Sequence, residues 1–553
     1  MSNSLINTAM SGLNAAQVAL STVSNNISNY NVAGYNRQTA ILAQNGGMAT
    51  MSGFIGNGVT VTSVNREYNQ FITNQLRGAQ SAFGAQNAYY EKISQIDNLL
   101  ASKTNPLSTN MQDFFTNLQN LVSNAGDDAA RQTVLGKANG LVNQFNNTDK
   151  FLRDMDNGVN QQISDTAQQI NSYGQQIAKL NDEITRLRGS AGGEPNALLD
   201  QRDQLVTELN QLVGVQVTQQ DGDAYTVSFA NGLTLVQGSN TYQVEAMPSS
   251  SDPSRLTIGY NRGNGASEVP EGQITSGSLS GVLKFRSETL DGVRNQLGQL
   301  ALAMADSFNQ QHRAGFDLNG DAGGDFFSFS GGRVVDNTRN TGDASLSVAY
   351  TDTGKVKAND YRVEFDGSNW QVSRLPDNVK VNATPGTSAD GKPTLNFDGL
   401  EVSIDGNAQA KDSFTVKPVC DVAGNLKVAI TDSSKIAAAG KDDSGRGDNE
   451  NAKKLLDLQT KNLVDGKATL SGAYAGIVSG VGNQTAAAKA IATSQAKIVT
   501  QLGEQQQSMS GVNLDEEYGE LLRFQQYYMA NAQVIQTASS LFDALLNIRL
   551  FHC

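Results

Sequence analysis

Few side chains in this sequence could carry thiol or imidazole chemistry. Its 553 residues include two histidines, His312 and His552, and two cysteines, Cys420 and Cys553. These four residues do not make a ligand set of the common zinc kind, and no arrangement of serine, histidine and aspartate offers a nucleophile. A disulfide would require folding to bring Cys420 and Cys553 together. We therefore expect no catalytic, metal-binding or cofactor-binding residues in this group.

One loop places carboxylates at a spacing that calcium favours. In "GFDLNGDAGGDFF", Asp317, Asn319 and Asp321 match positions 1, 3 and 5 of a calcium-binding loop. Ala322 replaces the glycine that the sharp turn needs, and Ser328 stands where the closing glutamate is required. The pattern therefore favours an ordinary turn over a calcium site.

A second group of ionisable residues lies in "LLDQRDQLVTELNQLVG", where Asp200, Arg202 and Asp203 follow one another closely. Acid-base catalysis needs two carboxyl groups at a defined separation, which a sequence does not give. A solvated or helix-pairing face is the favoured interpretation. A cell-wall hydrolase is the alternative from the enzyme class, and a zymogram on cell-wall substrate would detect it.

Composition limits the partners of the chain. The 41 basic and 54 acidic residues give a net charge of −13, which disfavours nucleic acid because nothing offsets the phosphates. No stretch approaches the roughly 18 to 20 apolar residues of a membrane span, so we expect no membrane insertion. The N-terminus also lacks the basic and apolar regions of a cleavable signal. These features indicate a cytoplasmic protein, unless an export route reads a different signal.

The N-terminal segment carries no side chain that is charged at neutral pH before Arg37. Between residues 5 and 27 its apolar positions recur at spacings of 4, 3, 4, 3 and 4, which is typical of a coiled-coil-like helix. The predicted turn after this helix contains Asn29, Gly34 and Tyr35, because asparagine and glycine favour left-handed turns. The predicted N-terminal seam is Ala9, Leu13, Ala16, Leu20, Val23 and Ile27.

The C-terminal segment has the same character. Asn513 is a predicted N-cap with Glu516 three residues on, and the 19 residues from Phe524 to Phe542 carry no charge. Matching seams invite the two terminal helices to pair, and their uncharged outer faces favour assembly with other copies over burial as a hairpin inside one molecule. The predicted C-terminal seam is Val534, Ala538, Leu541, Leu545 and Ile548.

Helical and strand-like patterns alternate along the chain. The sequence predicts an α+β multidomain protein: paired terminal helices in a coiled-coil-like domain, a long helical-bundle body and two inserted β-rich domains. The expected divisions are a terminal domain with an extended arm (1–64 and 510–553), a helical body (65–211, 275–325 and 448–509), a small β domain (212–274) and an outer β domain (326–440).

Both ends of the chain resemble one family. The stretch "AMSGLNAAQVALSTVSNNISNYNVAGYNRQ" resembles the N-terminal signature of the bacterial flagellar rod, hook and hook-associated proteins, and "SGVNLDEEYGELLRFQQYYMANAQVIQTASSLFDALLNI" resembles their C-terminal signature. Val32-Ala33 stands where rod and hook proteins usually have Thr-Pro or a similar pair, which is similar to the hook-associated members. The chain departs from the signature in its last residues, "LFHC", to which we assign no function.

This resemblance implies a structural subunit, not an enzyme, at the junction between flagellar hook and filament. It implies that the terminal helices form the inner tube and that the chain leaves the cell unfolded through the flagellar type III export apparatus. The implied partners are other copies of the chain in a ring, the hook protein, the next hook-associated junction protein and an export chaperone at the C-terminal region. The alternatives are a hook or distal-rod subunit, which would polymerise alone, and a secreted adhesin, which would bind glycans or mucin.

Overall fold

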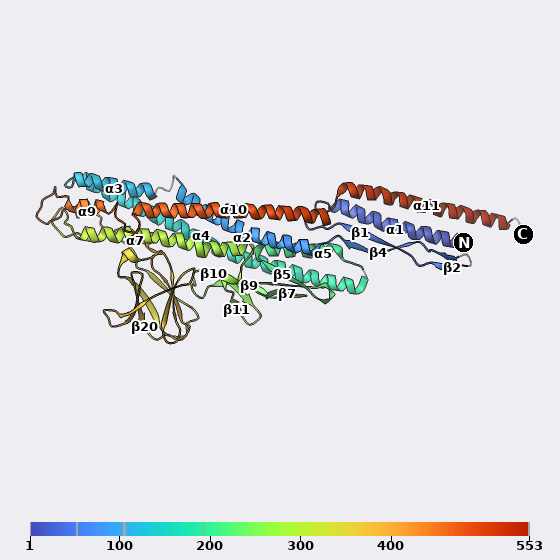
Figure 1. The fold of residues 1–553 in the computed structure, drawn as a ribbon, viewed down its shortest axis with the longest axis horizontal. Coiled ribbons are helices and arrows are strands. Elements are labelled where there is room, and N and C mark those ends of the chain that lie inside the picture. The colour runs from blue at the N-terminus through green and yellow to red at the C-terminus, as the bar shows by residue number, and fades with distance from the viewer. Residues whose placement is uncertain (1, 51–52, 103–106, 192, 551–553) are drawn as a thin grey trace.

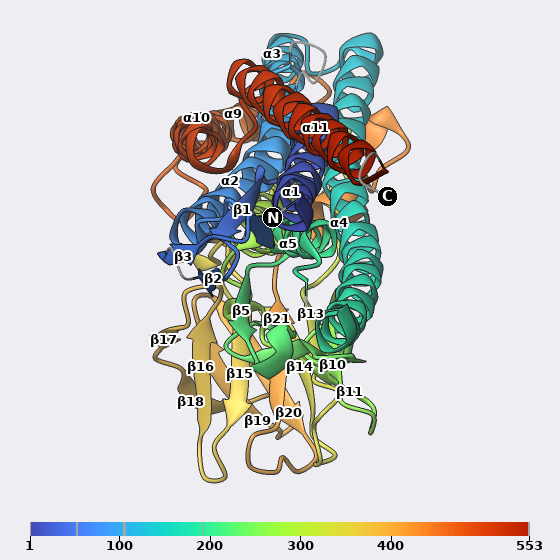
Figure 2. The ribbon, with the colours of Figure 1, turned by 90° about the vertical axis from the view of Figure 1, so that its right-hand side faces the viewer.

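The protein is elongated, with long helices along its length and strands on one side (Figure 1). The computed structural model describes residues 2–50, 53–102, 107–191 and 193–550. Both chain ends lie at the same end of the molecule, and the strand-rich parts project from the same side of the helices (Figure 2). This arrangement separates a narrow end, formed by the terminal helices and a few short strands, from a wider, mixed α and β part (Figure 1).

The helical end contains α1, Ser2–Asn29, and α11, Leu514–Leu550, lying side by side (Figure 2). After α1, the amide of Val32 donates to the carbonyl of Asn29 at 2.9 Å, and Gly34 has a φ of +80°, which suits glycine. An antiparallel pair follows, formed by β1, Gln38–Gln44, and β4, Val59–Arg66, with β2, Met48–Thr50, and β3, Gly53–Ile55, between them. The predicted turn and extended arm thus lie beside the terminal helices.

The body is a set of helices, some of which begin at a polar side chain that caps the first turn. The amides of Ala129 and Ala130 both donate to Asp127 Oδ1, and the amide of Gly472 donates to Thr469 Oγ1. The helices are α2 (Gln70–Ala101), α3 (Leu107–Ser123), α4 (Asp128–Ala191), α5 (Asn196–Leu212), α6 (Gly277–Lys284), α7 (Asp291–Arg313), α9 (Glu450–Asp457) and α10 (Leu470–Ser510). A π-helical stretch, Phe285–Leu290, joins α6 to α7.

A small β region follows α5. The Asn231-Gly232 pair has positive φ angles of 61° and 101°, as a tight hairpin turn requires. Two antiparallel sheets result, of orders β5-β6-β7-β8 and β11-β10-β9. Their strands are β5 (Val215–Gln219), β6 (Tyr225–Phe229), β7 (Leu233–Gln237), β8 (Asn240–Thr241), β9 (Gln243–Pro248), β10 (Leu256–Asn261) and β11 (Ala266–Glu268).

An outer β region lies between α7 and α9. It has a five-stranded sheet of order β13-β21-β15-β16-β17 and a four-stranded sheet of order β14-β20-β19-β18. The strands are β13 (Arg333–Asp336), β14 (Ser345–Tyr350), β15 (Tyr361–Phe365), β16 (Trp370–Arg374), β17 (Val379–Val381), β18 (Thr384–Thr387), β19 (Pro393–Phe397), β20 (Leu400–Asp405) and β21 (Ser413–Lys417). We use "outer β region" for residues 333–417.

The flanks of this region belong to the helical body. Phe326 and Phe327 pack against Phe308 of α7, with ring centroids 4.8 and 5.5 Å away, and β12, Phe327–Ser328, pairs with β22, Lys427–Val428. A domain boundary at residue 326 therefore falls inside the packed body, because these aromatic rings bury their surface against helices. The separable part begins at β13 and ends at β21.

The described residues form a large and a small hydrophobic core that reflect this architecture, besides a minor cluster of Ala125, Ala438 and Ala452. One large cluster runs from the body helices into both β regions. The second contains Ala19, Val23 and Phe524 as buried members, with Leu20, Ile27, Ala40 and Leu521 packed around them. Because buried apolar area supplies most of the stability of a packed unit, the paired terminal helices are held by a much smaller core than the body.

Candidate assembly surface

The inner face of α1 carries the predicted N-terminal seam. Ala9, Ala16 and Val23 are buried, and Leu13, Leu20 and Ile27 are half-buried. The polar residues between them, such as Asn14, Gln17 and Ser21, are exposed. The seam residues therefore face into the pair with α11, as the 4, 3 spacing requires.

The inner face of α11 is rotated from the predicted seam. Ala538 is buried, but Val534 and Leu541 are 42% and 55% exposed. The side chains of Leu545 and Ile548 lie outside the described part of the chain. The 4, 3 spacing of apolar residues selects the most apolar stripe of α11, whereas the contact with α1 uses a stripe that includes polar residues. This stripe is Glu517, Leu521, Phe524, Asn531, Ile535 and Ala538.

Small residues on α1 explain this choice. A Cβ atom built on Gly12 would lie 2.5 Å from Asn531 Oδ1, so a larger residue at this position would displace the Asn531 side chain from its present place. Ala15 and Ala19 lie on the same face and are also buried. The glycine and alanine face of α1 leaves room for the amide side chain of Asn531 on α11. The apolar stripe of α11 therefore lies at the edge of the contact.

That edge forms an apolar groove of about 370 Å³ between the two helices. Exposed apolar side chains occur along both helices and include Met10, Leu522 and Met529 in addition to the groove residues. Contiguous apolar surface of this kind marks a protein interface. The groove is lined by Leu5, Ala530, Gln533, Val534, Thr537, Ala538 and Leu541.

A buried carboxylate joins the terminal helices to the arm. The side chain of Glu517 is 1% exposed, and its carboxylate accepts from Arg37 Nε at 2.6 Å and from Asn26 Nδ2 at 3.0 Å. Asn26 Oδ1 accepts from the amide of Gln38 and from the hydroxyl of Tyr35. Burial, followed by the charges of Asp200 and Glu517, raises the pKa of Tyr35 to about 12. The first charged side chain of the sequence thus closes a joint with the other end of the chain.

Replacing this carboxylate should loosen the helical end selectively. We expect Glu517→Gln to weaken this joint by about 1.5 to 3 kcal/mol, because the hydrogen bond from Arg37 to a buried, charged carboxylate is lost. Limited proteolysis should then cut faster between α1 and β1 and between α10 and α11. Glu516→Gln is the matched control: Glu516 also faces Arg37, at 3.3 Å, but is 60% exposed, and should change the cutting rate little. Equal effects of the two substitutions would contradict the assignment.

A second joint fixes the arm to the body. Arg66 Nη1 donates to Asp203 Oδ2 at 2.7 Å and to Asp200 Oδ1 at 3.0 Å, and Asp200 also accepts from the side chain of Asn36 at 2.6 Å. Asp203 further accepts from Arg77 Nη2 at 3.1 Å and from the hydroxyl of Tyr225 at 3.0 Å. This network connects the arm, α2, α5 and the small β region.

The predicted face of Asp200, Arg202 and Asp203 is therefore not solvated. All three residues are buried, since α5 packs with this side against its neighbours. Burial raises the pKa of the Asp200 carboxyl, although the bonds from Asn36 and Arg66 oppose the shift. The sequence also allowed a helix-pairing face as an interpretation. The hydrogen bonds from Arg77 of α2 to Asp203 agree with that interpretation.

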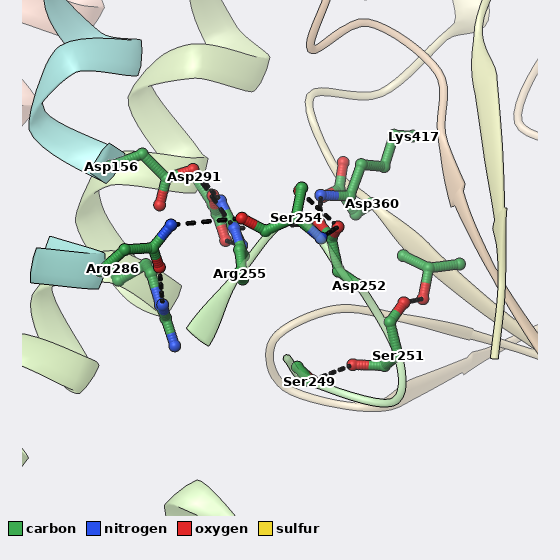
Figure 3. A network of polar contacts seen from close by, with 12 residues as sticks. Asp156, Ser249, Ser251, Asp252, Ser254, Arg255, Arg286, Asp291, Asp360 and Lys417 are labelled. Atoms are coloured by element: carbon green, nitrogen blue, oxygen red, sulfur yellow. Dashed lines mark hydrogen bonds and ion pairs between the residues drawn. The ribbon is translucent and has the colours of Figure 1, made fainter. Parts of the chain in front are cut away.

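A third joint holds the outer β region against the body (Figure 3). Lys417 Nζ of β21 lies 2.5 Å from Asp252 Oδ2, in the loop between β9 and β10. In the same loop, Arg255 donates from Nη1 to Asp291 Oδ2 at 2.8 Å and from Nη2 to Asp156 Oδ2 at 3.1 Å. Sequence spacing gave no sign of this cluster, because its members come from four distant segments.

The residues considered for metal and thiol chemistry have structural contacts. His312 is fully buried, with Nδ1 2.8 Å from the carbonyl of Gly324 and Nε2 accepting from the amide of Ala437, and burial lowers its pKa. Burial likewise raises the pKa of the free Cys420 thiol to about 12. His552 and Cys553 lie outside the described residues.

The predicted turn at Asp317 is held by its own backbone and by a lysine. The amides of Asn319 and Asp321 donate to Asp317 Oδ1, and the Lys435 ammonium lies 3.0 Å from Asp317 and 2.8 Å from Asp321. In the described part of the chain, no group of three or more histidine, cysteine, aspartate or glutamate side chains is placed to hold a metal ion. None of the described helices is long and apolar enough to span a bilayer.

Comparison with known proteins identifies the two ends first. Residues 6–36 match the family model of flagella basal body rod proteins, and residues 505–548 match the C-terminal model of flagellar basal body rod FlgEFG proteins. These matches, on two helices that pair in the structure, define an axial protein of the bacterial flagellum. Between them, residues 93–327 match the helical domain of flagellar hook-associated protein FlgK, and residues 335–418 match the D2-like domain of flagellar hook-associated protein 1.

The chain belongs to the family of flagellar hook-associated protein 1. It is 56% identical to that protein of Escherichia coli (strain K12) over 550 residues, covering 99% of this chain and 100% of the relative. It is 55% identical to that of Salmonella typhimurium over 556 residues, with coverage of 99% and 100%. The structure of the flagellar hook junction protein FlgK from Burkholderia pseudomallei superimposes with a TM-score of 0.74 at 29% identity, covering 79% of this chain and 100% of that one. The resemblance inferred from the terminal sequences is confirmed.

Proposed function

We propose that this chain is a structural subunit that joins the flagellar hook to the filament, with the terminal helix pair as its assembly surface. It is an extracellular component of the flagellum, exported by the type III route, and it is not an enzyme. The observation that carries the assembly surface is the groove beside α1, where Val534 and Leu541 leave 42% and 55% of their side chains exposed in the described part of the chain.

The uncharged outer face of α1 and the uncharged stretch of α11 from Phe524 to Phe542 suit repeated contacts between copies. Desolvating an amide or hydroxyl that finds a hydrogen-bond partner costs far less than burying an unpaired charge. Copies packed side by side in a ring would therefore bury Leu541 and its neighbours without isolating any ionised group. In this arrangement the terminal pair forms a coiled-coil-like inner tube, and Asn29, Gly34 and Tyr35 turn the chain toward the body.

The remaining parts have distinct proposed positions. The helical body surrounds the inner tube, and the small and outer β regions are insertions that face outward, consistent with their projection from one side of the helices (Figure 2). The proposed partners are the hook protein on one side and the next hook-associated junction protein on the other. An export chaperone would hold the C-terminal region, whose apolar stripe needs covering before assembly.

Antibody labelling of detached flagella, viewed by electron microscopy, tests this function directly. Label confined to a short band between hook and filament is the expected result. Label along the whole hook would instead indicate a hook subunit.

The outer β region should be dispensable for this joining. We expect replacement of residues 333–417 by a short Gly/Ser linker to leave filaments attached, because the aromatic flank residues and the terminal helices remain. The linker can be short, since Arg333 and Lys417 are paired across neighbouring strands. The measurement is the fraction of hooks that carry filaments in electron micrographs. Loss of filaments while export continues would place the outer β region in the junction contact itself.

A further inference from the structure

A cleft of about 530 Å³ lies where the small β region, the start of α7 and the outer β region meet. The outer β region is held there by contacts from two sides. Asn295 and Gln299 of α7 donate to Asp360 and to the carbonyl of Val356, and the amide of Thr338 donates to the carbonyl of Ser250 in the β9–β10 loop. The cleft therefore marks the contact between the outer β region and the body.

Charges at this contact occur in matched pairs (Figure 3). Four cations each contact a carboxylate: Lys417 contacts Asp252, Arg255 contacts Asp156 and Asp291, Arg294 contacts Asp156, and Arg286 contacts Glu271. The four cations and four carboxylates of this set balance one another. Buried ions are tolerated when they are paired in this way.

Asp360 is a fifth carboxyl group at this contact, and it is not paired with any of these four cations. It is 9% exposed and lies at the start of β15, and its Oδ1 atom accepts from Asn295 Nδ2 at 3.0 Å. Among the described residues, no cation lies within ion-pair distance of its carboxyl group. An ionised Asp360 would have no direct ion-pair partner in this largely desolvated contact, and such a charge is costly in free energy.

We propose that the contact between the outer β region and the body is a pH-sensitive joint in which Asp360 is the group that binds the proton. Protonated Asp360 allows the outer β region to dock, and ionised Asp360 loosens it. This proposal concerns the two parts of one chain and stands independently of the proposed position of the chain in the flagellum.

The surroundings of Asp360 support this assignment. Burial, together with the charge of Asp291, raises the pKa of its carboxyl, although Lys417 and Arg255 oppose the shift. The pKa values of the paired carboxyls Asp252 and Asp291 are lowered instead, so these groups stay ionised while Asp360 titrates. The charged and titratable groups around the cleft are Asp252, Arg255 and Glu268 from the small β region, Glu271, Arg286, Glu288, Asp291 and Arg294 from the body, and Arg362, Lys417 and the nearby Cys420 from the outer side.

The sign of the pH effect follows from this shift. A carboxyl with a higher pKa when docked binds its proton more tightly in the docked state, so docking is strongest at low pH. The stabilisation begins to fall above about pH 3.9, the value for a free aspartate, and is lost once the pH exceeds the docked pKa. Each unit of pKa difference changes the docking equilibrium about tenfold.

A proton fits this place better than a metal ion. Asn295 Oδ1 is buried without a hydrogen-bond partner, and together with Asp360 it offers only two oxygen ligands. Among the described residues, no group of three or more acidic, histidine or cysteine side chains is placed to hold a metal ion. Since calcium takes six to eight oxygen ligands, the pair is too small for such an ion.

The test is amide hydrogen exchange of the full chain between about pH 4.5 and about pH 8.5, corrected for the intrinsic pH dependence of exchange. In the wild type we expect protection of the 250–256 loop and of the Thr338 amide to fall at least about tenfold as the pH rises. Protection of α4 in the body should stay constant. Asp360→Asn should remove this pH dependence and keep the loop protected at high pH.

Asp377→Asn is the matched control, because Asp377 is an exposed carboxylate of the same outer β region. It should leave the pH dependence of the wild type unchanged. Wild-type protection that does not fall with pH, or an unchanged pH dependence in Asp360→Asn, would overturn the proposal. The wild-type measurement alone decides the matter if Asp360→Asn does not fold.

Discussion

Leu541→Asp should abolish the joining of hook and filament while leaving the isolated chain folded. The Leu541 side chain is 55% exposed in the single molecule, so the new carboxylate stays hydrated there. In the proposed ring the same position is covered by a neighbouring copy, where an unpaired charge costs several kcal/mol, on the order of 4. We expect an unchanged melting temperature of the monomer, with filament subunits released into the medium and loss of motility.

The melting temperature of the monomer reports on folding, and motility reports on assembly, so the two measurements together separate these effects. Leu541→Met keeps the volume and apolar character of the side chain and should retain motility. Wild-type swimming in Leu541→Asp would show that the groove of α1 and α11 is not an assembly surface. A lowered melting temperature of the monomer would show that Leu541 belongs to a core within the molecule.

Asp203→Ala should produce the largest loss of stability among single substitutions in the arm and α5. It removes a carboxylate that accepts from Arg66, Arg77 and Tyr225 in a buried setting. Leaving buried guanidinium groups without their partner costs about 3 to 5 kcal/mol. Chemical denaturation followed by circular dichroism should show a shift of the midpoint toward lower denaturant concentration.

Asp182→Ala provides the comparison for this experiment, because Asp182 is an exposed carboxylate on α4, the neighbouring helix. An exposed substitution of this kind changes stability by about 0.5 kcal/mol or less. Should both variants unfold at the same denaturant concentration, the network around Asp203 would contribute nothing measurable to the joint between arm and body.

Helix positions could be predicted from sequence because local signals dominate them. Asn513 was readable as a boundary, since its side chain accepts from the amide of Asp515 and its carbonyl from the amide of Glu517. The phase of α11 could not be obtained in this way. Which of its faces meets α1 depends on Gly12 and its alanine neighbours more than 500 residues earlier, and apolar periodicity carries no information about that fit.

The joints were equally hidden in the sequence. Arg255, Asp156 and Asp291 read separately as ordinary surface charges, because charged residues are mostly exposed. Their burial depends on three segments folding together, and Asp360 is distinguished only by the cation that it lacks. By contrast, the family resemblance could be recognised from the sequence, since the terminal segments carry their distinctive residues in continuous stretches.

The joint between Arg37 and Glu517 makes the helical end depend on an intact chain. Its two partners are separated by 480 residues, so it closes only when nearly the whole polypeptide is in place. A chain that is cut short would still fold its body, whose core is separate, but would lack the second helix of the pair. In the proposed assembly, a subunit shortened in this way would present α1 without α11 and would lack the groove lined by Leu5, Val534 and Leu541.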